Sequence, residues 1–208
     1  MGYSRNKCWR CYGFPQPKSR RAKIYLACDG ACRFNGKPWA QGGIGCGIWK
    51  RDPRRPNEQQ FISVIKPVSA NLDRYNLPKT TNQFAEAQAL LRVLQQLDFL
   101  FQHGSDDDVD ECRFFGLFID SNYMLDCIFE HIGNWQEKAE NSGEDTWRNS
   151  RNQPVIHQTI LEKILRLIFK NFMGTGRTLK FYQCSSHQDQ TCCFNRKVDE
   201  LGTDGADK

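Results

Sequence analysis

The stretch from Ile24 to Trp49 reads IYLACDGACRFNGKPWAQGGIGCGIW and contains the features that decide the fold. Its first residues, Ile24 to Cys28, form a short apolar run typical of a buried strand, and Asp29 follows directly. The loop signals between Arg33 and Gly43 and the alternation from Ile44 to Trp49 predict a turn and then an antiparallel strand. Asp29 therefore either starts an ordinary hairpin turn or is a functional carboxylate, because a lone buried charge is costly.

The size and composition of the chain favour one globular domain with an appendage. The 208 residues are enough for a well-buried core, and no apolar run approaches the ~20 residues that span a bilayer. Ten cysteines without a secretory signal indicate reduced thiols and an intracellular protein, cytoplasmic or nuclear, with no membrane association.

The positive charge is concentrated at the N-terminus. Residues 1–28 carry seven basic residues and no acid, so the 22 basic and 24 acidic residues of 29–208 leave a net charge of −2. We expect a basic, flexible arm at 1–22 and one folded domain at 23–208. Such an arm suits contact with phosphates, although a solvated tail without a partner or a mitochondrial targeting segment fits the same composition.

The remaining patterns predict a mixed α/β architecture. We expect a third strand at Gln60–Pro67, a helix from about Asn82 to His103, a strand at Arg113–Ile119, a helix from Asn122 to about His131, a polar segment at Gly133–Asn152, a helix opened by Pro154, a strand at Thr178–Cys184 and a short helix at Asn195–Leu201. Three strands followed by helical crossovers imply an antiparallel meander continued by parallel strands, with helices on the sheet.

Four acids stand where such a sheet gathers its functional groups. Asp29 and Asp120 follow strands, while Glu86 and Asp199 lie on helices beside polar or glycine-rich segments. Glu86 alone is also explained by its place near a helix N-terminus. If all four converge, each pair of charges ~4 Å apart costs about 4 kcal/mol at an effective dielectric of 20, so bound cations or protons are required. Oxygen ligands favour Mg²⁺ or Mn²⁺.

Five motifs in this order resemble type 1 ribonuclease H. They are Asp29-Gly30-Ala31-Cys32 with Asn35, Thr81-Asn82-Gln83-Phe84-Ala85-Glu86, Asp120-Ser121-Asn122-Tyr123, His187, and Asn195-Arg196-Lys197-Val198-Asp199-Glu200-Leu201. The resemblance runs from about Lys23 to Leu201. It implies the ribonuclease H-like fold, a mixed five-stranded sheet flanked by helices.

The resemblance also implies an activity and its catalytic residues. The family's enzymes cut the RNA strand of RNA–DNA hybrids as metal-dependent endonucleases, leaving 5′-phosphate and 3′-hydroxyl ends. Asp29 would bridge two Mg²⁺ ions, for which Mn²⁺ can substitute. Asp199 would complete the ion that activates water, and Glu86 with Asp120 would hold the ion at the leaving oxygen. His187, in a loop two residues longer than in familiar members, would assist proton transfer or product release; otherwise it is a surface histidine.

The resemblance also implies which residues of this sequence bind the substrate. Cys32, through its backbone, and Asn35, Asn82 and Gln83 match positions that hydrogen-bond 2′-hydroxyl groups, although asparagine also serves turns and helix caps. A pocket for a DNA phosphate matches Lys79 and Thr81, with Glu130 at its third position, where an acid would oppose the phosphate. Asn122, Tyr123 and Asn195 complete the expected contacts with the hybrid.

Three hypotheses remain for the function. The first is an active, monomeric ribonuclease H acting on RNA–DNA hybrids. The second is a non-catalytic module that binds hybrids or other nucleic acids on the same fold. The third is a fold-related exonuclease, integrase or resolvase.

Overall fold

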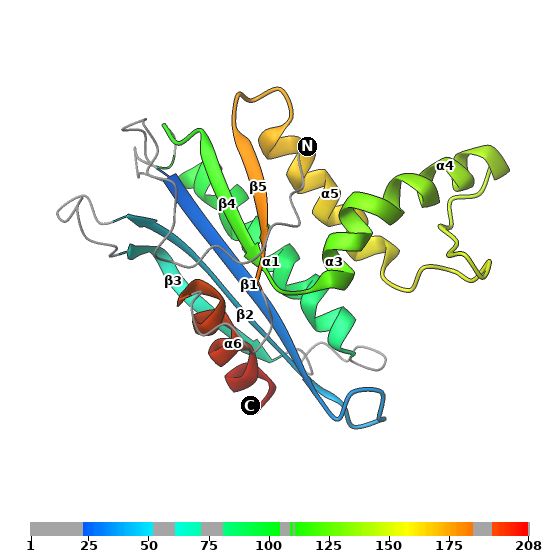
Figure 1. Ribbon diagram of the computed structural model, residues 1–208, viewed down its shortest axis with the longest axis horizontal. Coiled ribbons are helices and arrows are strands. Elements are labelled where there is room, and N and C mark those ends of the chain that lie inside the picture. Colours follow the sequence, from blue (N-terminus) through cyan, green and yellow to red (C-terminus); the bar gives the residue numbers. More distant parts are fainter. Residues whose placement is uncertain are drawn as a thin grey trace.

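The computed structural model describes residues 23–51, 61–71, 81–104, 109, 111–184 and 193–207 (Figure 1). The expected basic arm at 1–22, Lys79 and His187 lie outside the described residues. In chain order the elements are β1 (Lys23–Arg33), β2 (Gln41–Arg51), β3 (Phe61–Asn71), α1 (Asn82–His103), β4 (Phe114–Ile119), α3 (Asn122–Asp126), the π-helical segment η2 (Cys127–His131), α4 (Ile132–Ser142), α5 (Gln158–Phe172), β5 (Thr178–Gln183) and α6 (Cys193–Ala206).

The five strands form one mixed sheet in the order β3-β2-β1-β4-β5. β1, β2 and β3 are antiparallel neighbours, while β4 pairs parallel to β1 and β5 parallel to β4. The predicted fold class, an antiparallel meander extended by parallel strands and flanked by helices, is therefore confirmed.

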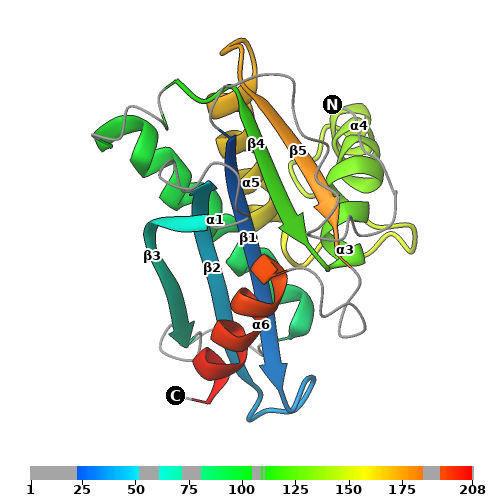
Figure 2. The same ribbon diagram turned by 60° about the vertical axis from the view of Figure 1, so that its left-hand side comes forward.

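Alternation along β1 divides the core between the two faces of the sheet. Ile24 and Leu26 belong to the large cluster that includes the apolar side of α1. Tyr25 belongs to a smaller cluster on the other face, where its ring stacks on Phe194 of α6 with centroids 5.6 Å apart. Figure 2 shows α6 on one side of the sheet and α1 with α5 on the other. The sheet is therefore covered on both faces, and β1 is its central strand.

β1 is longer than the apolar run predicts. The expected strand at Ile24–Cys28 continues through Asp29 to Arg33, because β2 pairs with it as far as Arg33↔Gln41. Its pairing with β4 ends earlier, at Ala27↔Phe118. Asp29 thus lies within β1 rather than at a hairpin turn, just beyond the place where β4 ends.

Two helix boundaries in the middle of the chain differ from the sequence-based expectations. The helix expected to end near His131 continues through η2 and α4 to Ser142, since Ile132 and Ala139 are buried, and it ends at Gly143 with a left-handed φ of 67°. The polar segment at Gly133–Asn152 is therefore half helical. The helix expected from Pro154 begins only at Gln158.

The closing helix is longer than expected. It spans Cys193–Ala206 instead of Asn195–Leu201 and includes Gly202 and Gly205. These glycines face the sheet closely: a Cβ on Gly205 would lie 2.6 Å from the backbone oxygen of Ala70. The packing of α6 against the sheet thus outweighs the low helix propensity of glycine. Among the described helices, none is both long and apolar enough to cross a membrane.

Candidate active site

Asp29 is the most buried of the four acids singled out from the sequence. Its side chain is 9% exposed, and its Oδ1 accepts a hydrogen bond from the backbone N–H of Gly30 at 2.9 Å. Burial, followed by the negative charges of Asp120 and Asp199, raises the pKa of Asp29 from 3.8 to about 8. A hydrogen bond between Asp29 and Asp199 also favours the protonated form. The carboxylates therefore come together closely enough for a proton to be retained at neutral pH.

Asp120 comes directly after β4, on the strand next to Asp29. Burial raises the pKa of Asp120, and a hydrogen bond from the Asn195 side chain opposes this rise. The buried Oδ1 of Asn195 has no hydrogen-bond partner among the described residues. Asn195 thus positions Asp120 with its side-chain amide N–H, while its amide oxygen accepts no hydrogen bond from the described residues.

Glu86 reaches the same place from the second turn of α1. Its Oε2 accepts a hydrogen bond from the hydroxyl of Ser121, which also caps α3 by accepting from the N–H of Met124 at 3.2 Å. Burial raises the pKa of Glu86, the Ser121 hydrogen bond lowers it, and the charge of Asp120 raises it further. Ser121 therefore ties the acid on α1 to the end of β4.

Two glycines allow the helices to approach the central strands. A Cβ on Gly30 would lie 2.2 Å from the backbone N of Glu86, and a Cβ on Gly45 would lie 2.0 Å from the carbonyl oxygen of Val198. Gly45 is the β2 partner of Asp29. The backbones of α1 and α6 therefore rest almost directly on β1 and β2, which brings Glu86 and Asp199 to opposite sides of Asp29.

All four acids line one cavity of about 830 Å³. Its lining residues are Asp29, Gly30, Ala31, Cys32, Asn35, Thr81, Asn82, Gln83, Glu86, Asp120, Ser121, Asn122, Tyr123, Asp199 and Thr203. Seven of the nine expected substrate-binding residues are in this list. Asn195 lies behind Asp120, and Lys79 is outside the described residues together with the expected catalytic His187. Glu130 is exposed on η2 and is not among the lining residues.

The local contacts of these residues include ordinary structural ones. Thr81 caps α1, its Oγ1 accepting from the N–H of Phe84 at 3.1 Å. The N–H of Asn82 donates to Oδ1 of Asn35 at 3.3 Å, which joins the start of α1 to the β1–β2 hairpin. Tyr123 is half-buried and packs against the core, and burial raises its pKa. Asn82 and Gln83 expose their side chains to the cavity rim.

The donor chemistry of the cavity fits divalent cations. Among the described residues, no group of three or more His, Cys, Asp or Glu side chains is already arranged to hold a metal ion. The four carboxylates around the cavity nevertheless offer only hard oxygen donors. Burial, with a smaller contribution from their mutual repulsion, raises the pKa of Asp29, Glu86 and Asp120, and a bound cation would offset both effects. These residues therefore fit Mg²⁺ or Mn²⁺ better than softer metals.

The sequence-based predictions missed two contacts at the candidate site. One is Ser121 as the partner of Glu86, which the Asp-Ser pair at the end of β4 offered as a signal. The other is Gln183, the last residue of β5, whose side-chain amide donates to Oδ1 of Asn122. Gln183 pairs with Ile119 in the parallel register of β4 and β5, so it ends at the same sheet edge as Asp120. Only the pairing register of β4 and β5 shows that Gln183 lies near Asp120.

Comparison with known proteins agrees with this architecture. The RNase H family model matches residues 21–207. A ribonuclease H of Clostridium botulinum is 22% identical over 187 residues, covering 89% of this chain and 97% of that protein. A ribonuclease H of Prochlorococcus marinus is 27% identical over 143 residues, covering 69% of this chain and 68% of that protein.

Solved structures share the fold at low sequence identity. A type 1 RNase H with the type 2 active-site motif superposes with a TM-score of 0.62 at 14% identity, covering 90% of this chain and 73% of that one. The RNase H domain of PFV superposes with a TM-score of 0.57 at 16% identity, covering 89% and 95%. With a family model that spans nearly the whole sequence, the chain belongs to the RNase H family of hydrolases.

Proposed function

We propose that this chain is a monomeric, metal-dependent endonuclease that hydrolyses the RNA strand of RNA–DNA hybrids and leaves 5′-phosphate and 3′-hydroxyl ends. The observation that carries the proposal is the meeting of four carboxylates, from β1, α1, α6 and the end of β4, in one cavity of an RNase H fold. A binding module without catalysis does not require such a costly cluster of buried acids.

The carboxylates would serve as ligands. Asp29, Glu86, Asp120 and Asp199 would hold two Mg²⁺ ions, which when bound supply water activation and charge stabilisation at the leaving oxygen. Gly30 fixes one oxygen of Asp29 through its N–H, and Ser121 fixes one oxygen of Glu86. Asn195 does the same for Asp120. These contacts orient the remaining carboxylate oxygens towards the cavity before substrate arrives.

The rim of the cavity would select the RNA strand. Asn35, Asn82 and Gln83 carry side-chain amides at the rim, and an amide can both donate to and accept from a 2′-hydroxyl. The backbone of Cys32 lies on the same rim. Thr81 with Lys79 would bind a phosphate of the DNA strand, and Asn122 and Tyr123 would line the path of the hybrid.

Residues 1–22 would act as a separate basic arm, and residues 23–208 as the catalytic domain. The arm carries six basic residues and no acid. Each phosphate contact releases counterions and contributes about −0.9 to the slope of log affinity against log salt. Removing residues 1–22 should flatten this slope by roughly two to four units. Hybrid affinity of the full and shortened chains, measured over a salt series, tests this, and parallel lines would contradict it.

The central experiment is a comparison of nucleic-acid substrates. Labelled RNA–DNA hybrid, double-stranded RNA and double-stranded DNA would each be incubated with the chain in Mg²⁺, in Mn²⁺ and in EDTA. We expect cleavage of the RNA strand of the hybrid alone, internal to the strand and only with a divalent ion. End-group analysis should find 5′-phosphates.

The outcomes separate the alternatives. Binding of the hybrid without cleavage would favour a non-catalytic module. Cleavage of double-stranded DNA, or stepwise release of nucleotides from one end, would favour a fold-related nuclease of another class. Metal-independent cleavage would contradict the role given to the carboxylates.

A further inference from the structure

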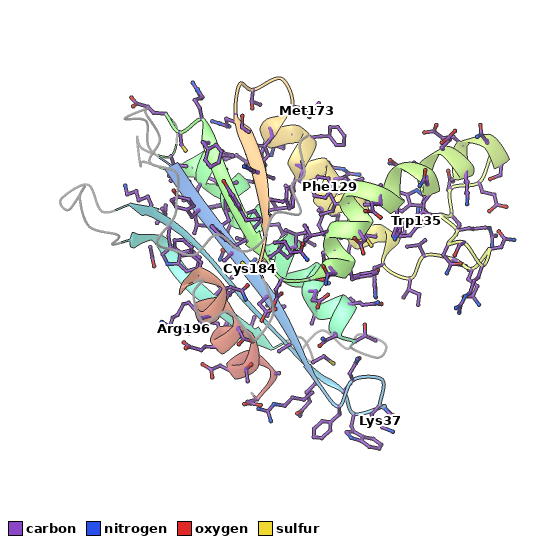
Figure 3. All side chains as sticks on the ribbon, in the orientation of Figure 1. Lys37, Phe129, Trp135, Met173, Cys184 and Arg196 are labelled. Atoms are coloured by element: carbon purple, nitrogen blue, oxygen red, sulfur yellow. The ribbon has the colours of Figure 1, made fainter. Side chains whose placement is uncertain are left out.

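The turn between β1 and β2 carries two exposed aromatic rings and a lysine. Its sequence from residue 34 is Phe-Asn-Gly-Lys-Pro-Trp, and the side chains of Phe34 and Trp39 are 57% and 63% exposed. Lys37, which Figure 3 labels, lies between them at the tip of the hairpin, where the turn projects away from the sheet. Among the described residues, neither ring packs on another aromatic ring. Two large apolar rings therefore face solvent beside a positive charge.

The turn is held in a defined conformation. The N–H of Lys37 donates to the carbonyl of Phe34 at 2.9 Å, and the N–H of Ala40 donates to the carbonyl of Lys37 at 3.1 Å. The base of the hairpin is fixed to the end of α6 by Arg33, whose Nη2 lies 2.7 Å from Oδ2 of Asp207. Asn35 fixes the other side to the start of α1 by accepting from the N–H of Asn82. Presenting the rings thus costs little conformational entropy when a ligand binds.

The turn is continuous with the proposed hybrid-binding cavity. Cys32 and Asn35, which flank Phe34, both line that cavity. A hybrid seated there would therefore reach the aromatic turn at one end of the bound segment. Lys37 adds a positive charge suited to a phosphate.

The ligand that these rings suit is a base with an exposed face. Inside a duplex the base faces are covered by their neighbours, and inserting a ring between them costs a few kcal/mol. Unpaired bases have free faces, and stacking on exposed aromatic side chains is the usual way in which proteins bind them without sequence preference. Paired nucleic acid offers Phe34 and Trp39 such a face only on the outer side of its last base pair.

We propose that Phe34, Trp39 and Lys37 form a second binding site for a single-stranded nucleotide that continues from the hybrid. The site would direct cleavage to hybrids that end in unpaired nucleotides. It rests on the proposed function, because the hybrid in the cavity delivers the unpaired strand to the turn. It is separate from the carboxylates and from the 2′-hydroxyl contacts.

The test is a competition between two hybrids in one reaction. A blunt hybrid and a hybrid of the same sequence with a six-nucleotide overhang, carrying different fluorophores, are cleaved together by the full chain in Mg²⁺. The competition is repeated with four overhanging hybrids, in which the overhang is the 5′ or the 3′ end of the RNA strand or of the DNA strand. For at least one end we expect kcat/KM to favour the overhang by roughly 10-fold, the effect of one stacked base. Phe34→Ala/Trp39→Ala should reduce that preference to about one while cleaving the blunt hybrid within twofold of the original rate.

Two controls sharpen the result. Phe99→Ala removes an aromatic ring of similar exposure, 60%, from α1 and should keep the preference. Trp39→Phe keeps a ring and should also keep it. A 2-aminopurine in the overhang, but not one in the paired region, should lose fluorescence on binding.

The inference and the proposed function fail in different ways. If the chain cleaves hybrids but shows no overhang preference, or one that the double variant keeps, the inference is wrong and the proposed function stands. Equal losses on blunt and overhanging hybrids would show that the turn contacts paired nucleic acid, which also overturns the inference. If no hybrid is cleaved, both proposals fail.

Discussion

Two hollows of this molecule are lined by four acids each, and only one has the properties of an active site. The first is the cavity of about 830 Å³ around Asp29. The second, of about 580 Å³, lies between α4 and α5 and is lined by Glu140, Glu144, Asp145 and Glu162. Its floor includes the buried Trp147 and the half-exposed Phe169.

The two sets of acids differ in burial and in partners. In the second hollow Glu140, Glu144 and Asp145 are exposed, and Glu144 pairs with Arg148 at 2.7 Å. In the first cavity the acids face one another, and burial raises the pKa of Asp29 to about 8. Exposed acids keep their hydration and cost little, while buried ones persist only with a compensating charge or proton. Burial and convergence, rather than the number of acids, therefore distinguish the candidate active site from the second hollow.

The largest expected effect comes from removing one charge in each hollow. Asp29→Asn should reduce hybrid cleavage at least ~100-fold, because several kcal/mol of charge stabilisation depend on this ligand. Asp145→Asn in the second hollow should leave the rate within twofold. Initial rates on a labelled hybrid in Mg²⁺ measure both. More than a few per cent residual activity in Asp29→Asn would remove Asp29 from its proposed role.

A second prediction tests whether His187 contributes to turnover in addition to the carboxylates. His187→Ala should slow turnover roughly 10- to 100-fold, at or below the usual contribution of a general acid or base. The affinity for Mg²⁺ should not change. His103→Ala, at the exposed end of α1, is the control and should have no effect on the rate. An unchanged rate in His187→Ala would make His187 a surface histidine.

A third prediction concerns the glycine contacts that bring the first set of acids together. Gly45→Ala would place a Cβ 2.0 Å from the carbonyl oxygen of Val198 and force α6 off the sheet. We expect a loss of about 1–3 kcal/mol in the free energy of unfolding, with reduced cleavage because Asp199 moves with α6.

Gly133→Ala on α4, the helix that forms one side of the second hollow, is the matched control. Outside its own helix and chain neighbours, no atom lies within 4 Å of the added Cβ. Because the residue is inside α4, the free energy of unfolding should rise by up to ~1 kcal/mol. Urea unfolding measures both variants. Equal stability of Gly45→Ala and the original chain would contradict the close approach of α6.

A fourth prediction uses pH in the absence of metal. The pKa of Asp29 is raised from 3.8 to about 8, so the folded state binds a proton that the unfolded state releases between these values. The free energy of unfolding in EDTA should therefore fall as pH rises from about 4 to 8, by at least ~1 kcal/mol. Asp29→Asn should flatten this dependence, and Asp145→Asn should keep it. Stability that rises over this range in EDTA would contradict the buried cluster.

The smallest expected effect concerns an exposed acid outside both hollows. Glu130 is expected to oppose a DNA phosphate, so Glu130→Asn should tighten hybrid binding by roughly two- to threefold at low salt, and less as salt screens the charge. Glu137→Gln on α4 is the control for a general change in charge. If both variants bind equally well, the match of Glu130 to the phosphate pocket is wrong.

The central part of the fold follows from sequence patterns because its signals are local. The apolar run at Ile24–Cys28, the apolar positions of α1 and the strand ending before Asp120 each determine an element with little help from the rest. The convergence of the four acids follows from the topology, since parallel strands and their crossover helices gather at one sheet edge.

Features that depend on tertiary contacts were not predictable in this way. The extension of β1 through Asp29 depends on β2 as a partner, and α6 continues through Gly202 because its backbone packs closely on the sheet. The hydrogen bond from Gln183 to Asn122 depends on strand register. Each of these features involves contacts between residues far apart in sequence, so no local sequence pattern predicts it.

The position of Asp199 on α6 has a consequence for biosynthesis. Of the described helices, α6 comes last in the sequence, and it also covers the Tyr25 and Trp49 side of the sheet. A chain emerging from the ribosome can build most of the α1 side of the core before α6 is made, but it lacks one of its four carboxylates until α6 docks. Asp199 would therefore join the other three proposed metal ligands only after α6 has been made and has docked, so a chain cut before residue 193 would lack one ligand of the proposed metal site.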